Sequence, residues 1–418
     1  MNRWVKIGAI IIAFIVVVVL SLGAGILIGS AGFGVFAGST SNEGEPEEFR
    51  IFWQAWNTVH ENFVDKDALD PTQLTYGAIR GMVQALGDEG HTSFLTPEER
   101  ERQETELAGT FSGIGATLGV RDNLPVIVAP FDGSPADQAG VKPGDIILQV
   151  DGEDVTSLPL NDIVTRIRGP EGTEVTLSLL RPDETRSLEV TITRGEIKVP
   201  AATWAMVPDS TIALLRLSQF TANAEEDVVN SLKAANEAGA TAMILDVRNN
   251  PGGLFNQAIA VTSQFLSEGN VLLEEDADGN RQAYPVEPGG VGTELPMVVL
   301  INGGSASSSE ILAGAIQDYD RGDLVGETTF GTGTVLQPYT LGDGSVLLLG
   351  TRQWLTPKGR LIRKQGISPD HVVELPIEAE LLTPEGIEEL EQSEIQASED
   401  TQLLKALELL GVPWAAQN

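Results

Sequence analysis

Residues 298–316 have the sequence Val-Val-Leu-Ile-Asn-Gly-Gly-Ser-Ala-Ser-Ser-Ser-Glu-Ile-Leu-Ala-Gly-Ala-Ile. An apolar, β-branched run leads to Asn302, small residues follow, and apolar residues return at helical spacing from Ile311, which predicts a strand, a tight turn and a helix. Such a turn lifts a hydroxyl clear of the sheet and aims the N–H groups at the helix start toward whatever bonds to it. A serine in this turn is therefore a candidate nucleophile, and a simple Ser/Gly-rich helix cap is the alternative.

Composition narrows the class of protein. A chain of 418 residues exceeds the size of a usual single core, so two or three domains are expected. Sixty acidic and 26 basic residues give a net charge of −34, which argues against binding of nucleic acid, because its phosphates require Lys and Arg. The chain has no cysteine, and this excludes disulfides, thiolate catalysis and Cys-ligated metal sites.

Residues 7–29 form an apolar run without charge, long enough to cross a bilayer as a helix. Arg3 and Lys6 precede it and the acidic segment Glu43–Glu48 follows, so the sequence predicts a single-pass anchor in the cell membrane with the rest of the chain outside the cytoplasm. A cleaved signal peptide is the alternative. The Gly- and Ser-rich residues 30–47 are expected to form a flexible linker.

Residues 48–109 are expected to form a helical N-terminal segment, because aromatic and aliphatic side chains recur there at helical spacing. Thr96 and Pro97 are typical of a helix start. The polar loop at residues 87–95 contains His91, one of only three histidines in the chain.

Residues 110–197 resemble a PDZ domain, a β-rich module that binds peptide C-termini. The resemblance rests on Phe111-Ser-Gly-Ile-Gly-Ala116 and on the stretch Gly133–Leu148. Glycines two residues apart let successive N–H groups converge on a carboxylate, while the bound peptide adds as a strand to the sheet edge. The residues expected to bind the peptide carboxylate are Gly113, Ile114 and Gly115.

From residue 198 to residue 376, apolar strand-like runs alternate with helical patterns, which is typical of an α/β domain. Residues 377–418 form an acidic tail with two amphipathic helical patterns. The tail either packs on the α/β domain or supports self-association into a homo-oligomer.

Four segments of the chain resemble, in order, motifs of the C-terminal processing peptidases, also called tail-specific proteases: Asp246–Gly253, Asn302–Glu310, Gly326–Gly331 and Gly366–Asp370. The resemblance implies a crotonase-like α/β catalytic domain accompanied by the PDZ domain. It implies a membrane-linked or secreted serine endopeptidase that binds protein C-terminal tails and needs no metal or organic cofactor. Membership of this family would make Ser307, the middle serine of Ser-x-Ser-x-Ser-Glu, the nucleophile.

Peptide hydrolysis by a serine requires N–H donors for the developing oxyanion. The N–H of Ser308 follows the nucleophile, and the turn at Gly252 and Gly253 ends another predicted strand, so these three residues are the expected donors.

One position departs from the family pattern. Thr332 stands where the family carries its catalytic lysine, and a threonine hydroxyl cannot act as a general base near neutral pH. Leu336 occupies the family's glutamine position, with Gln337 one residue later, so side-chain alternation along a strand would point Gln337 the other way.

Three interpretations follow. His91 is the preferred base, because its loop resembles the histidine loop of relatives with a Ser-His arrangement, although Arg363 stands where those relatives use a glutamate. Lys358 or Lys364 could instead supply the base. The third interpretation is a catalytically inactive, membrane-tethered PDZ adaptor that binds peptides.

Overall fold

The computed structural model describes residues 46–414 except residues 89, 90, 122, 132, 183, 185 and 377. The chain divides into two compact units between Leu74 and Thr75. The first unit holds α2 (Phe49–Asn62), whose aromatic side chains contact one another at tilted or edge-on angles, and it contains the start of α3 (Pro71–Gln84). In the second unit Thr96 caps α4 (Pro97–Ala108), as the sequence predicts.

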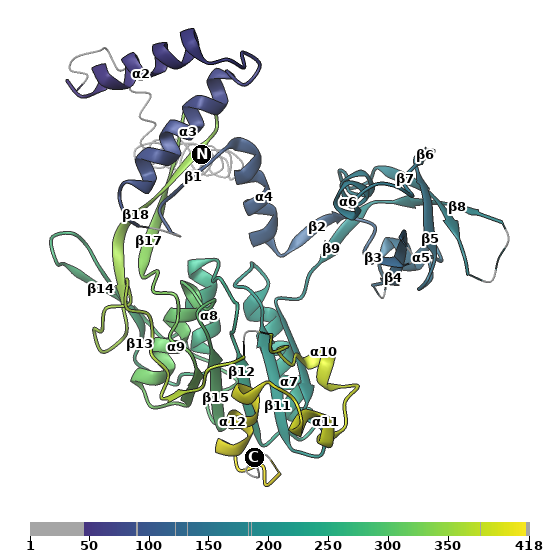
Figure 1. Ribbon diagram of the computed structural model, residues 1–418. Helices are drawn as coiled ribbons and strands as arrows, with labels where there is room; N and C mark the ends of the chain where they lie inside the picture. The colour runs from purple at the N-terminus through teal and green to yellow at the C-terminus, as the bar shows by residue number, and fades with distance from the viewer. Residues whose placement is uncertain are drawn as a thin grey trace, which may run out of the picture. The chain divides into compact units, whose positions relative to one another are not determined.

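The second unit is built around a six-stranded sheet with the order β10-β11-β12-β15-β16-β19 (Figure 1). β10 is antiparallel to β11, and the other neighbouring strands are parallel. The strands are β10 (Ala202–Met206), β11 (Ile212–Leu217), β12 (Ala242–Asp246), β15 (Met297–Ile301), β16 (Asp323–Gly326) and β19 (His371–Val372).

Each face of this sheet is covered by helices. Leu215 and Leu245 pack with the first group of helices, whereas their neighbours Leu214 and Ile244 pack with the second, as side-chain alternation along a strand requires. The first group consists of α7 (Ala224–Glu237), α8 (Phe255–Ser263) and α9 (Ser308–Asp318). The second consists of α10 (Pro384–Ile387), α11 (Gln392–Gln396) and α12 (Thr401–Leu409), drawn in yellow in Figure 1.

The C-terminal tail therefore packs on the α/β sheet as its second helical layer. Ile387, Ile395, Leu403 and Leu407 are fully buried in this contact. Self-association into a homo-oligomer stays a prediction.

The β-rich region has its own core and a sheet with the order β3-β4-β5-β7-β8, in which β6 pairs with β5. β3 is an edge strand, and the ribbon of β2 and β9 connects this sheet to the rest of the chain. The elements are β2 (Thr110–Gly113), β3 (Ala116–Arg121), β4 (Leu124–Pro130), α5 (Pro135–Gln138), β5 (Ile146–Val150), β6 (Glu153–Asp154), α6 (Leu160–Ile167), β7 (Glu174–Leu180), β8 (Leu188–Thr193) and β9 (Gly195–Lys198).

A further sheet joins distant parts of the second unit in the order β1-β18-β13-β14, with β17 also paired to β18. Its strands are β1 (Ser93–Leu95), β13 (Asn270–Glu275), β14 (Arg281–Pro285), β17 (Thr334–Thr340) and β18 (Val346–Leu355). β17 begins two residues after Thr332, and β1 begins two residues after His91, so this sheet connects both positions through β18.

The fold class expected from the sequence needs one correction. It included an N-terminal transmembrane helix, but no helix within residues 46–414 is both long and apolar enough to cross a bilayer. The residues on which that expectation rested, 7–29, lie outside the described part of the chain. The fold that the structure supports is the α/β domain with its PDZ-like domain and helical segments.

Candidate active site

The motifs from the sequence meet at one edge of the six-stranded sheet. β12 leads into residues 247–253, β15 into residues 302–307, and β16 into residues 327–332. These three strands are parallel neighbours, so their carboxyl ends lie side by side, where α/β sheets usually carry their functional sites.

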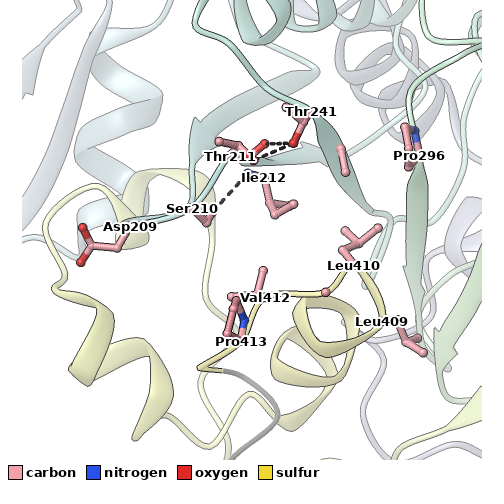
Figure 2. A pocket seen from close by; sticks show the side chains of 12 residues that line it. Asp209, Ser210, Thr211, Ile212, Thr241, Pro296, Leu409, Leu410, Val412 and Pro413 are labelled. Atoms are coloured by element: carbon pink, nitrogen blue, oxygen red, sulfur yellow. Dashed lines mark hydrogen bonds between the residues drawn. The ribbon is translucent and has the colours of Figure 1, made fainter.

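A cavity of about 710 Å³ opens instead at the amino ends of the strands, between Thr211, Thr241 and Leu410, which follows α12 (Figure 2). Its hydroxyls are engaged: those of Thr211 and Thr241 bond each other at 2.6 Å, and that of Ser210 donates to the Val207 carbonyl. The described residues that line this cavity include no histidine or lysine that could activate one of these hydroxyls, so we place the active site at the carboxyl ends.

The three serines of the motif have different surroundings. Ser305 is fully buried and donates to the Val247 carbonyl at 2.7 Å, and buried Ser309 donates to the Asn250 carbonyl at 2.9 Å. Ser307 is only half-buried, and its hydroxyl donates to no acceptor in the described residues. Its backbone has φ 55° and ψ −114°, a strained conformation for a residue other than glycine. Of the three, Ser307 is thus the hydroxyl free to react.

A buried carboxylate holds this turn. Glu310 accepts hydrogen bonds from the N–H groups of Ser307 (2.9 Å), Gly331 (2.6 Å) and Thr332 (3.0 Å), and from the hydroxyls of Thr329 and Thr332. The Thr332 hydroxyl also accepts from the Ser307 N–H at 2.7 Å. In the place of the family's lysine, Thr332 therefore ties its loop to the nucleophile turn. No role was predicted for Glu310, although a Glu three residues after a helix cap is a known capping signal.

The second turn, at Gly252 and Gly253, adjoins Ser307. A Cβ atom on Gly252 would lie 2.8 Å from the Ser307 Cβ, so only glycine fits there. The Gly252 N–H donates to the Asn250 side chain at 2.9 Å and is not free for an oxyanion. The N–H groups of Gly253 and Ser308 have no acceptor among the described residues. Of the three expected donors, these two are available.

Asparagines connect the two turns. Asn249 and Asn302 exchange two hydrogen bonds of 2.9 Å, and the Asn250 carbonyl accepts from the Ala306 N–H at 3.0 Å. Asn249 has φ 56°, a left-handed conformation that asparagine tolerates better than most residues. The donors of one turn are thereby fixed relative to the serine of the other.

His91 lies by the strand that follows Thr332, where the structure shows it bonded to Thr334 and not to Ser307. Its Nδ1 bonds the Thr334 hydroxyl, its ring meets the Trp354 ring edge-to-face at 6.3 Å, and no hydrogen bond joins it to Ser307 in the described residues. Burial lowers the pKa of His91 below its ordinary value, nearby Asp88 opposes this effect, and Arg363 reinforces it. The imidazole is therefore neutral near pH 7.

Asp88 and Arg363 form an ion pair at 2.8 Å beside this histidine. Burial raises the pKa of Asp88, but hydrogen bonds from Thr92 and Arg363 outweigh it and hold that pKa below its ordinary value. Arg363, where the resemblance to Ser-His relatives leads us to expect a glutamate, thus pairs with Asp88, three residues before His91.

The candidate lysines are exposed. The Lys358 amine lies 4.0 Å from the Asp320 carboxylate, and Lys364 bonds the Gly331 carbonyl only through its backbone N–H. Neither amine contacts Ser307 in the part of the chain that the structure describes. Gln337 is exposed and Leu336 half-buried, which agrees with opposite orientations of the two side chains.

The expected carboxylate loop of the PDZ-like domain borders a pocket of about 160 Å³. Gly113, Ile114 and Gly115 line it together with Val164 and Ile167 of α6. β3, which starts at the end of this loop, has a free edge where a peptide strand can add.

Comparisons with known proteins agree with these features. The profile of Peptidase family S41 matches residues 211–373, and that of the PDZ domain matches residues 126–181. The carboxyl-terminal-processing protease of Synechocystis is 36% identical in an alignment of 387 positions that covers 87% of this chain and 87% of its own. The carboxy-terminal processing protease CtpA of Bacillus subtilis is 33% identical and covers 88% of this chain and 78% of its own.

A solved structure of a photosystem II D1 C-terminal processing protease is 30% identical, covers 82% of this chain and 97% of its own, and has a TM-score of 0.45. Relatives above 30% identity thus span most of the chain, including the segments that form the two turns. The chain belongs to the carboxy-terminal processing proteases of peptidase family S41, which are serine peptidases with a PDZ domain.

Proposed function

We propose that Ser307 is the nucleophile of this protease and that the N–H groups of Ser308 and Gly253 form its oxyanion hole. The observation that carries the proposal is the turn at Ser307, where a strained serine with a free hydroxyl adjoins two N–H groups without acceptors. Donors fixed in advance at the place where charge develops are usually the largest single contribution to such catalysis.

The reaction proceeds through an acyl-enzyme. The Ser307 oxygen attacks the scissile carbonyl carbon while its proton passes to a base, and the C–N bond then breaks as the base returns the proton to the leaving amine. Water next attacks the Ser307 ester, giving its proton to the same base. The new C-terminal carboxylate leaves, and the serine hydroxyl is restored.

His91 is the base in this proposal. Its support is a neutral imidazole next to the strand that begins beyond Thr332, together with the engagement of the Thr332 hydroxyl by Glu310. Because the Nδ1 atom is bonded to Thr334, the Nε2 atom is the one that must approach the Ser307 hydroxyl. Catalytic hydrogen bonds often tighten in this way only when substrate binds.

Substrate tails enter through the PDZ domain, which binds peptide C-termini. The loop at Gly113–Gly115 receives the terminal carboxylate, and the catalytic domain cuts upstream. We further propose that the enzyme works at the cell membrane, outside the cytoplasm. The support is the apolar run at residues 7–29 with its preceding Arg3 and Lys6.

Labelling of the full chain with a fluorophosphonate probe tests this function. We compare wild type with Ser307→Ala and His91→Ala between pH 5 and pH 9. Labelling of wild type that is lost in both variants is the expected result. Labelling that survives His91→Ala contradicts the assigned base. A wild-type protein that binds a C-terminal peptide but never labels is the PDZ adaptor instead.

A further inference from the structure

The C-terminal tail carries a buried carboxylate that both caps a helix and pairs with an arginine. Asp400 is fully buried at the start of α12, where it accepts hydrogen bonds from the N–H groups of Leu403 (3.1 Å) and Leu382 (3.0 Å). The same carboxylate also faces Arg248, 152 residues earlier in the chain. Capping of the helix alone does not require this arginine.

Arg248 is held between two carboxylates. Its guanidinium bonds Asp400 at 2.7 and 3.0 Å and Asp246 at 2.9 and 3.0 Å, and all three side chains are buried. Arg216 completes the group with a contact of 3.1 Å to Asp246. The charges of two carboxylates and two guanidinium groups thus balance. The two bidentate pairs hold the Arg248 side chain in a single orientation.

Arg248 stands immediately before the turn that presents the Gly253 N–H. Its own N–H donates to Asp246 at 2.9 Å, and the next residue, Asn249, takes the left-handed conformation and pairs with Asn302. Because Arg248 directly precedes this turn in the chain, a displacement of Arg248 would shift the residue from which the turn starts.

We propose that Asp400 is a positioning residue for peptide hydrolysis, which acts through Arg248 to fix the oxyanion turn beside Ser307. This inference rests on the proposed function, since it assumes that Gly253 donates to the oxyanion. Asp400 would then give the tail a role in positioning the site, whereas the apolar residues of the tail layer belong to the core alone. Buried ion pairs add little net stability compared with apolar packing, so stability alone does not account for this one.

Asp400→Asn is the direct test. Asparagine keeps the size of the side chain and caps helices as well as aspartate does, but it loses the charge opposite Arg248. We expect the rate of fluorophosphonate labelling and kcat to fall on the order of 10²-fold, as for other small misplacements of catalytic groups. The final labelling stoichiometry of the folded protein and KM for a tail peptide should stay as in wild type, because Asp400 does not line the PDZ pocket. Tm should fall, because the buried Arg248 loses one of its two charged partners.

Leu407→Ala is the matched control. Leu407 is fully buried in the same tail layer but has no polar group to pair with Arg248, so its truncation should lower Tm and leave the labelling rate of the folded protein unchanged. The double variant Asp400→Asn with Arg248→Met removes both charges, and it replaces the single variant in the labelling test if Asp400→Asn does not fold. It should label as slowly as Asp400→Asn.

The outcomes separate the two proposals. Labelling of Asp400→Asn or of the double variant at the wild-type rate overturns the positioning role, as does an equal slowing in Leu407→Ala. A wild-type protein that does not label at all overturns the proposed function itself.

Discussion

Two glycine-rich turns of this protein are suited to receive a negatively charged oxygen, but they are held in different ways. The PDZ turn at Gly113–Gly115 is fixed mainly by neighbours in its own domain, such as the Ser134 hydroxyl, which donates to the Gly115 carbonyl at 2.8 Å. The turn at Gly252–Gly253 is fixed by the side chain of Asn250 and by the ion pairs of Arg248, which reach into the tail.

This difference between the turns corresponds to a difference between the negative charges that they are suited to receive, a peptide carboxylate and a reaction oxyanion. A peptide carboxylate is present before and after binding, so a turn that receives it changes affinity. An oxyanion exists only during the reaction, so a turn that receives it changes the rate of the chemical step. Tight positioning is needed for the second purpose, and buried ion pairs of Arg248 hold the chain just before the second turn.

The largest effect is expected from Gly253→Ala. Gly253 has φ 148°, and a Cβ there would lie 2.3 Å from the Phe220 carbonyl oxygen, so the turn must move and its N–H must turn away from Ser307. We expect kcat to fall by about 10²–10³-fold, the usual cost of losing one oxyanion donor. Steady-state kinetics with a tail peptide measures this. Wild-type kcat in a folded variant would exclude Gly253 as a donor.

The next largest effect is a difference in pH dependence between peptide hydrolysis at Ser307 and peptide binding at the PDZ turn. Because burial lowers the pKa of His91, its neutral form persists below the ordinary value of about 6.5. We expect kcat/KM to fall about tenfold per pH unit only below that lowered pKa. Binding of the tail peptide to Ser307→Ala should not follow this titration. An acid limb with a midpoint well above pH 6.5 would indicate a lysine instead.

Gly115→Ala should lower the affinity of the PDZ domain for a tail peptide. Gly115 has φ 73°, and a Cβ there would lie 2.5 Å from the Ser134 Cβ, so the carboxylate loop must shift. We expect Kd for a tail peptide to rise about tenfold, equivalent to about 1.4 kcal/mol. At saturating peptide, kcat should be unchanged. A fall in kcat without a change in Kd would mean that the two turns are coupled more closely than their contacts indicate.

Much of this contrast could be predicted from the sequence, because each turn is encoded by adjacent residues. The pattern around Ser307 indicated the strand, turn and helix, and Gly113–Gly115 indicated the peptide loop. Asn250 two residues before Gly252 was also a readable signal, since asparagine side chains often bond the backbone two residues on. It would have shown that the Gly252 N–H is engaged.

The contacts that fix the turns could not be predicted in the same way. The donors to Glu310 include residues near position 330, and the partner of Arg248 is Asp400 in the tail. Pairing over such distances depends on the order and register of the strands, which one sequence does not reveal. The bond of His91 to Thr334 depends likewise on the pairing of β1 and β17 with β18.

The smallest effect is expected from Asn249→Gly, which tests whether the positive φ or the side chain matters at the base of the oxyanion turn. Glycine adopts φ 56° without strain but removes the amide that bonds Asn302. The loss of one neutral hydrogen bond costs about 1 kcal/mol, so we expect kcat to fall about fivefold at unchanged KM. Asn249→Ala is the matched control, because it loses the same bond and adds backbone strain. It should therefore be slower than Asn249→Gly. Equal rates in the two variants would mean that the conformation at residue 249 does not limit the position of the turn, and that the ion pairs of Arg248 hold it alone.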